Sequence, residues 1–139
     1  MEVITRELTF STSPDGGMVD VTSKIEEELK KTGIKEGIVT VFVPGATGAV
    51  STIEYEPGLL KDFPAMLERI APSDIHYHHH ETWGCDNGRS HVRATLIGPS
   101  LTVPFKNSKL LLGTWQQVVF IELDTRPRQR RLILQFIGK

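Results

Sequence analysis

The stretch Gly37-Ile-Val-Thr-Val-Phe-Val43 is β-branched and almost entirely apolar. Side chains of this kind favour strands, and a run of this length predicts a central strand of a sheet. The turn-forming run Pro44-Gly-Ala-Thr-Gly48 ends it, because proline and glycine interrupt regular structure. Apolar residues return over Val50–Tyr55, which predicts a second strand directly after the break.

The N-terminal part adds one strand and one helix. Alternation over Glu2–Phe10 predicts a strand, and Ser13–Gly17 predicts a turn, in which proline presets φ and glycine permits positive φ. Apolar residues recur at every fourth position within Asp20–Thr32, which predicts a helix with Gly33 as its C-terminal stop.

The middle of the chain predicts two further helices. Apolar residues three and four apart indicate a helix over Leu60–Ile70. Pro64 is tolerated only in a first turn, so we expect the regular part to begin near Asp62. Asn87–Ile97 predicts another helix, with a strand over Val92–Ile97 as the alternative.

The C-terminal third is typical of strands separated by turns. The predicted strands are Leu101–Phe105, Lys109–Leu112, Trp115–Leu123 and Arg131–Ile137. Strands therefore dominate the chain, with helices inserted between them. We expect one α+β domain over residues 1–139, with a mainly antiparallel, β-sandwich-like sheet and two to three packed helices.

The composition bounds the class of protein. The chain has 139 residues, of which 39% are hydrophobic and 24% charged, and a net charge of −1 gives no reason to expect a nucleic-acid or membrane partner. Cys85 is the single cysteine, which excludes an intrachain disulfide and fits a reducing compartment. The chain shows neither a signal peptide nor an apolar run of the roughly 20 residues that cross a bilayer. We expect a soluble, cytoplasmic protein.

All histidines of the chain lie within one segment, Ile75–His91. They are His76, His78, His79, His80 and His91. Imidazole is the commonest side-chain ligand of divalent metals and the usual acid or base near neutral pH. If Ile75–Glu81 is extended, alternation places His79 on the face opposite to its three neighbouring histidines. A site then needs a partner from elsewhere in the chain, and His91 is the candidate.

Two less specific interpretations of the segment are a solvated loop and a core histidine satisfied by a backbone carbonyl. Two histidines with a carboxylate or water are the usual makeup of an open catalytic metal site. The chain has no Cys/His finger spacing, which argues against a structural zinc site.

Four motifs lie in and after this segment: Tyr77-His-His79, Asp86-Asn87, Ser90-His-Val-Arg-Ala-Thr-Leu-Ile-Gly98 and Leu112-Gly-Thr-Trp-Gln116. Together they resemble the YjbQ-type family, often labelled secondary thiamine-phosphate synthase. Further matches lie at Val43–Thr47, Ile53–Pro57, Arg126–Arg131 and Phe136–Gly138. The resemblance covers nearly the whole chain. It implies an α+β domain that assembles as a homotrimer, and a weak thiamine-phosphate synthase activity.

The resemblance also implies a site. Its two histidines are His79 and His91, and the catalytic candidates are Glu54, Asp62, His79, Asn87 and His91. We expect a divalent metal ion (zinc, manganese or magnesium) on His79 and His91, with Asp86 completing the ligands. Many members carry a histidine in the loop that reads Gly45–Gly48 here, so this protein either does without that histidine or uses His78 or His80 in its place.

Thiamine-phosphate formation joins a pyrimidine pyrophosphate to a thiazole phosphate and expels pyrophosphate. It therefore needs cations and donors on phosphate oxygens. The candidates for phosphate binding are Thr47, Arg93, Thr114 and Arg126.

Alternatives remain for several of these residues. The cluster Arg126–Arg131 also fits a solvated surface or a subunit contact. Trp115 fits a core position, Glu56 a solvated turn, and Cys85 an incidental loop residue. Two functions stay open. One is a metal-dependent transferase or hydrolase acting on a phosphorylated small molecule. The other is a non-enzymatic trimeric protein that binds a metabolite or a metal.

Overall fold

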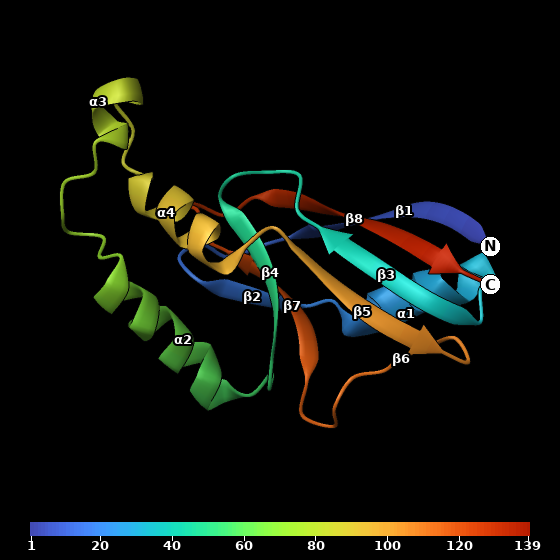
Figure 1. The fold of residues 1–139 in the computed structure, drawn as a ribbon. Coiled ribbons are helices and arrows are strands. Elements are labelled where there is room, and N and C mark those ends of the chain that lie inside the picture. The colour runs from blue at the N-terminus through green and yellow to red at the C-terminus, as the bar shows by residue number, and fades with distance from the viewer.

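The computed structural model describes residues 1–139 and contains eight strands and four helices (Figure 1). The strands are β1 (Glu2–Ser11), β2 (Gly17–Asp20), β3 (Glu36–Phe42), β4 (Gly48–Ile53), β5 (Ser100–Lys106), β6 (Lys109–Leu110), β7 (Gln117–Glu122) and β8 (Gln129–Gly138). The helices are α1 (Thr22–Thr32), α2 (Pro57–Ile70), α3 (His79–Trp83) and α4 (Gly88–Ile97). No helix is both long and apolar enough to span a membrane.

The strands form two antiparallel sheets. The larger has the order β1-β8-β3-β5-β6, and the smaller has the order β2-β7-β4. The expected α+β class is confirmed, with four helices in place of two or three. The predicted central position of the first quoted strand is confirmed too, because β3 lies between β8 and β5.

The small sheet is covered on both faces. Val118 and Phe120 of β7 point into the main core, which also holds α1 and the inner face of the large sheet. Val119 and Ile121 point the other way, into a second core with residues of α2 and α4. Successive strand residues face opposite sides, so β7 is buried at every one of these positions. The molecule therefore has three layers, with β7 in the middle one.

The helix over Asn87–Ile97 is confirmed as α4, and the strand alternative is wrong.

Near the N-terminus, Asp20 belongs to β2, which the sequence did not predict, and α1 begins only at Thr22. The Asp20 carboxylate accepts a hydrogen bond from the Thr22 N–H at 3.0 Å, which marks the change from strand to helix. A strand of four residues that contains a glycine is too short to show the alternation of apolar and polar residues by which strands are predicted.

The predicted start of α2 near Asp62 is wrong. Glu56 accepts hydrogen bonds from the N–H groups of Gly58 at 2.8 Å and Leu59 at 2.5 Å, so it is the N-cap and not a solvated turn residue. Proline at the first helical position is favourable, because its missing N–H has no partner there in any case. Pro64 consequently lies inside the helix, where packing of α2 on the second core outweighs its poor helix propensity.

The histidine segment is not extended, so the alternation argument does not apply to it. The N–H of Glu81 donates to the carbonyl of His78 at 3.0 Å, which closes the first turn of α3. This short helix protrudes from the end of the molecule opposite to both chain termini (Figure 1).

Trp115 lies in a turn before β7 and is 72% exposed, so its predicted core position is wrong.

The cap at Glu56 gives a test of the fold. We expect Glu56→Ala to lower the free energy of unfolding by about 1 kcal/mol, because two backbone N–H groups lose their acceptor. Chemical denaturation measures this change. Glu54→Ala is the matched control, since Glu54 is exposed and forms no hydrogen bond or ion pair. Equal stabilities of the two variants would contradict the capping role.

Candidate functional site

A polar cavity of about 260 Å³ lies where the turn between β7 and β8 meets the start of α4. Its lining comes from two short segments, and the residues are Cys85, Asp86, Asn87, Asp124, Thr125, Arg126 and Arg128. Of the predicted site residues, Asp86, Asn87 and Arg126 therefore face one cavity. The sequence did not single out Asp124, which follows the apolar strand β7 directly.

His79 and His91 come together as predicted. His79 is the first residue of α3 and His91 lies on α4, and their ring centroids are 4.5 Å apart with the rings tilted by 38°. Burial, and secondly the nearby His79, lower the pKa of His91, and they outweigh the opposing effect of Asp124. The His91 imidazole is therefore neutral at pH 7 and offers a free lone pair.

A chain of contacts joins the histidine pair to the cavity. The Cys85 Sγ lies 3.4 Å from Nδ1 of His79 and 3.1 Å from Oδ1 of Asn87. The Asn87 amide in turn lies 3.5 Å from a carboxylate oxygen of Asp124. Cys85 therefore lines the cavity and contacts the ring of His79.

Asp124 is almost fully buried and ionised. Burial alone would raise its pKa, but hydrogen bonds from the Thr125 N–H, Arg128 and the Thr47 hydroxyl hold the pKa of Asp124 at about 2. The Thr47 Oγ1 lies 3.2 Å from Asp124, and it accepts a hydrogen bond of 2.8 Å from Arg130. Thr47, predicted as a phosphate ligand, is thus engaged within the protein.

Behind this layer lies a second buried carboxylate, Glu122, the last residue of β7. It has no exposed area and pairs through both oxygens with the guanidinium of Arg130 on β8. The Thr12 hydroxyl donates a third hydrogen bond to it at 2.6 Å. The only sign of this pair in the sequence is the interruption of an apolar strand by two acidic residues. The pair joins the two sheets directly beneath the cavity.

A second cavity of about 290 Å³ lies beside His91. It is lined by Gly45, Ala46, Gly48, His91, Ala94, Thr95 and Pro99. The loop that contains Gly45, Ala46 and Gly48 therefore faces His91, and its small residues border open space there. Neither predicted substitute takes that place, because the ring of His78 contacts Glu81 and that of His80 contacts the Cys85 carbonyl.

Arg93 is not available as a phosphate ligand. It is 2% exposed, and its guanidinium donates to the carbonyl of Ala71 at 2.7 and 3.0 Å and to Glu68 at 2.9 Å. These bonds connect α4 to the end of α2. The hydrogen bonds of Glu68 with Ser73, and secondly with Arg93, lower the pKa of Glu68 to about 2. Arg93 therefore has a structural role.

Glu54 and Thr114 lie away from the histidine pair. Glu54 follows β4 and Thr47 precedes it, so their backbones are roughly 23 Å apart at the usual rise of a strand. Thr114 lies in the exposed turn before β7, on the Glu54 side of the small sheet, because Gln116 donates to Thr52. Asp62 is exposed on α2. One copy of the chain does not bring Glu54 and Thr114 to the two histidines.

The predicted metal ligands do not form a closed set. Only one group of three or more His, Cys, Asp or Glu side chains has all its ligand atoms within 4.8 Å of one another, and it consists of His76, His78 and Glu81. His79, His91 and Asp86 do not meet this geometry. The structure thus supplies two imidazoles at the predicted position and no third ligand.

The chain is similar to known proteins over nearly its whole length. The model of the family described as UPF0047 protein YjbQ-like matches residues 6–139. A UPF0047 protein of Methanothermobacter thermautotrophicus is 42% identical over 139 residues, which cover 100% of this chain and 95% of the relative. In Bacillus subtilis, the UPF0047 protein YugU is 28% identical, with coverage of 96% and 98%.

Solved structures agree with the fold. A YbjQ-like protein of unknown function from Sulfolobus solfataricus superposes with a TM-score of 0.92 at 30% identity, covering 99% of each chain. A hypothetical protein from Aeropyrum pernix superposes with a TM-score of 0.90 at 33% identity, covering 100% of each chain. The whole architecture is therefore shared, including the elements that carry the histidine pair.

The buried ion pair beneath the cavity gives a stability test. We expect Arg130→Met to lower the free energy of unfolding by about 3–5 kcal/mol, because it leaves the Glu122 carboxylate buried without its partner. Arg131→Met is the matched control. It removes an exposed pair with Glu7 and should change stability by less than about 1 kcal/mol. A small, equal effect of both substitutions in thermal or urea unfolding would show that the buried pair does not hold the sheets together.

Proposed function

This chain belongs to the YjbQ-like UPF0047 family, and we propose that its histidine pair and arginine-lined cavity form an active site for a phosphorylated small molecule. The observation that carries the proposal is the position of His91. It is a half-buried imidazole with a lowered pKa, and it is joined through His79, Cys85 and Asn87 to a cavity that two arginines line. Perturbed titratable groups beside a polar cavity are typical of catalytic sites.

The arginines suit phosphate. Arg126 is exposed at the cavity and forms no ion pair, so its guanidinium is free for two parallel hydrogen bonds to phosphate oxygens. Arg128 is paired with Asp124, which neutralises one of the two carboxylates that line the cavity, and Asp86 is the other. The cavity of about 260 Å³ lies just below the size that drug-like ligands need, so one small molecule fills it.

The proposed chemistry requires a substrate that extends from the arginine-lined cavity to His91, which lines the cavity beside Gly45 and Gly48. In a hydrolysis, His91 takes a proton from the attacking water while the water oxygen bonds to phosphorus. The bond to the leaving oxygen breaks, and the proton returns to that oxygen. Arg126 stabilises the charge that develops on the phosphoryl oxygens. Asn87 and Cys85 position the imidazole of His79 beside His91.

A finer form of the proposal is thiamine-phosphate synthesis, with Arg126 binding the expelled pyrophosphate and the cavity beside His91 taking the second substrate. A divalent metal ion, zinc, manganese or magnesium, belongs to the proposal as a cofactor. His79 and His91 would hold it, and Asp86 is not within reach. With that ion bound, His91 would be a ligand and would not act as the base described above. Such an ion would supply Lewis acidity at the phosphate.

The alternative is a non-enzymatic trimeric protein that binds a metabolite or a metal. The separating test is turnover. Untagged protein is supplied with a divalent metal and phosphorylated small molecules, or with the pyrimidine pyrophosphate and thiazole phosphate together. Released phosphate or pyrophosphate is then measured. We expect His91→Ala to lower kcat roughly 10²–10⁴-fold, as loss of an acid–base group does.

Arg126→Ala should raise KM, and Arg131→Ala is its control, because Arg131 belongs to the same cluster but does not line the cavity. Turnover that survives His91→Ala at the wild-type rate would contradict the catalytic role of His91. If no substrate turns over, but phosphate still binds and Arg126→Ala weakens that binding, the result supports the alternative of a non-enzymatic binding protein.

The homotrimer belongs to the same proposal. Glu54 and Thr114 lie too far from the histidine pair within one copy, so in an assembled site a neighbouring copy would supply them. We expect light scattering to give a mass about three times the 15.5 kDa of the chain. Co-expression of Glu54→Gln with His91→Ala chains should then restore activity that each variant lacks alone, because mixed trimers contain sites with both intact residues. Absence of restoration in mixed trimers would place Glu54 outside the site.

A further inference from the structure

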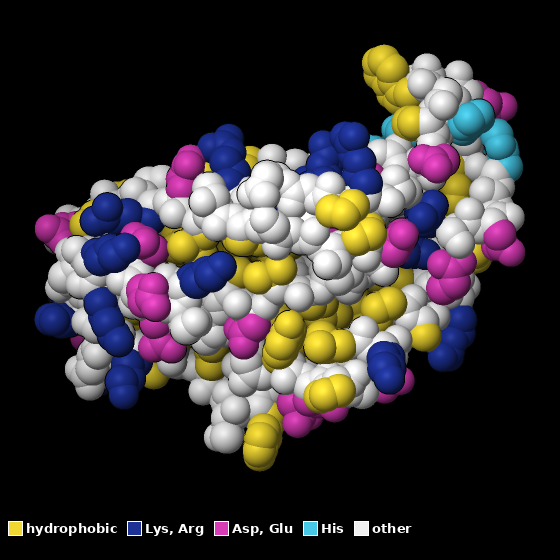
Figure 2. Space-filling view, turned by 180° about the vertical axis from the view of Figure 1, so that it is seen from behind, with side chains coloured by type: hydrophobic (Ala, Val, Ile, Leu, Met, Phe, Trp, Pro, Cys, Tyr) yellow, Lys and Arg dark blue, Asp and Glu magenta, His cyan; other side chains and the backbone are white.

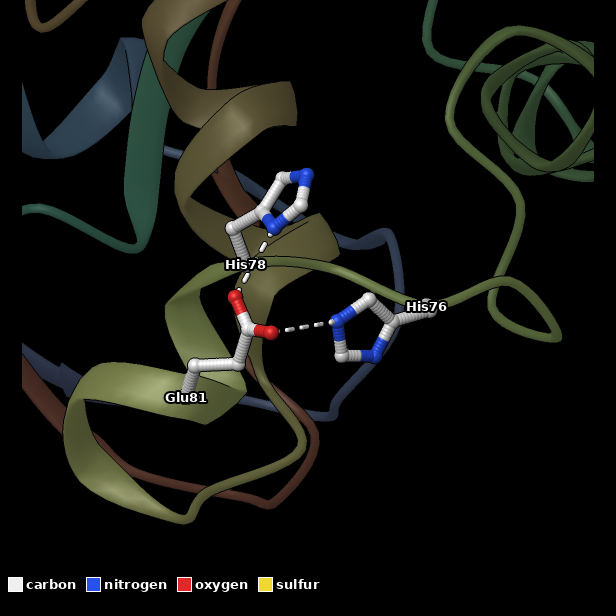
Figure 3. Close-up of side chains that lie close together, drawn as sticks. All are labelled: His76, His78 and Glu81. Atoms are coloured by element: carbon white, nitrogen blue, oxygen red, sulfur yellow. Dashed lines mark hydrogen bonds and ion pairs between the residues drawn. The ribbon is translucent and has the colours of Figure 1, made fainter.

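We propose that His76, His78 and Glu81 form a separate surface site for a divalent transition-metal ion, in addition to the site proposed above. Figure 3 shows the two imidazoles on either side of the Glu81 carboxylate, with one ring nitrogen of each directed at a different oxygen. His78 Nδ1 lies 2.8 Å from Oε2, and His76 Nε2 lies 3.7 Å from Oε1. All three ligand atoms lie within 4.8 Å of one another.

These distances suit a shared ion. Two ligands bound to a tetrahedral zinc ion at the usual bond lengths lie about 3.3 Å apart. The two measured distances lie on either side of that value, so small side-chain rotations bring the three atoms onto one ion. The rings of His76 and His78 are nearly perpendicular, at 84° with centroids 5.5 Å apart. They do not stack, and each lone pair therefore has a free approach to the centre.

The backbone holds the ligands at this spacing. His78 precedes α3 and Glu81 lies three residues later, and the hydrogen bond between their backbones fixes the turn. Tyr77, between the two histidines, donates from its hydroxyl to the Pro72 carbonyl at 2.7 Å. Its ring also packs on Gly88, where an added Cβ would overlap the Tyr77 side chain. The three ligands are thus attached to a segment whose backbone is held by the contacts of Tyr77 and by the turn from His78 to Glu81.

The ligand set indicates the class of ion. Two imidazoles with one carboxylate suit zinc, nickel, cobalt or copper, and not calcium or magnesium, which prefer oxygen. The side chains of His76, His78 and Glu81 are 58%, 92% and 63% exposed, so the remaining coordination positions face solvent and bind water or an external anion. Histidine side chains gather on the protruding end of the molecule in Figure 2, where such an ion is accessible.

Neighbouring histidines do not share this site. His79 faces His91 and Cys85, and His80 contacts the carbonyl of Cys85. His80 is therefore a matched control, because it has the same side chain two residues from His78 and does not belong to the triad. The independence of the two regions also lets one titration separate this proposal from the proposed function.

The test is calorimetric titration of untagged protein with zinc, repeated with cobalt, whose visible absorption reports its ligands. We expect His78→Ala and Glu81→Gln each to weaken one binding equivalent at least roughly tenfold, since each removes one of three ligands. His80→Ala and His91→Ala should leave that equivalent unchanged, while His91→Ala affects only ions held at the histidine pair. The proposal is wrong if zinc binding by His78→Ala and Glu81→Gln equals that of the wild type, or if the wild type binds no zinc. Circular dichroism of each variant checks that the fold is intact.

Discussion

The ion pair between Glu122 and Arg130 is the interaction on which the site depends. A carboxylate without exposed area is strongly unfavourable unless it is paired and hydrogen-bonded, and Arg130 and Thr12 satisfy it here. Glu122 ends β7 of the small sheet, and Arg130 lies on β8 of the large sheet. The requirement to pair one buried charge therefore fixes the two sheets relative to each other. Arg130 also lies 5.6 Å from the ring centroid of Phe120, so its position is determined from two directions.

This constraint extends to the loop that precedes β4. Arg130 donates to Thr47, and Thr47 contacts Asp124, so the loop from Gly45 to Gly48 is held against the floor of the cavity. Gly48 has no room for a side chain, because a Cβ there would overlap the ring of Phe120. The same loop borders the open space beside His91. The small side chains of Gly45, Ala46 and Gly48 therefore leave that space open.

The sequence predicted what depends on local periodicity. The strand at β3 and the helix at α4 follow from apolar spacing, and both are confirmed by the structure. The capping of α2 by Glu56, the role of Arg93 and the buried charge of Glu122 depend on which segments meet in space, and spacing along the chain does not encode that. The pairing of His79 with His91 was predicted from family motifs, whereas alternation, the physical argument offered for it, assumed an extended segment. Two backbone hydrogen bonds, from His80 to Tyr77 and from Glu81 to His78, form a turn at the start of α3, so the segment is not extended.

That turn also explains why the neighbouring histidines His78 and His79 belong to different groups. Helical residues are about 100° apart around the axis, so positions three apart share a face and adjacent positions do not. His78 and Glu81 consequently face solvent together, while His79 points inward to His91. Because His79 immediately follows His78, an ion bound on the outer face would restrain the same turn from which His79 reaches the inner site. The triad of His76, His78 and Glu81 and the pair of His79 and His91 thus share no ligand, but they are connected through the peptide bond between His78 and His79.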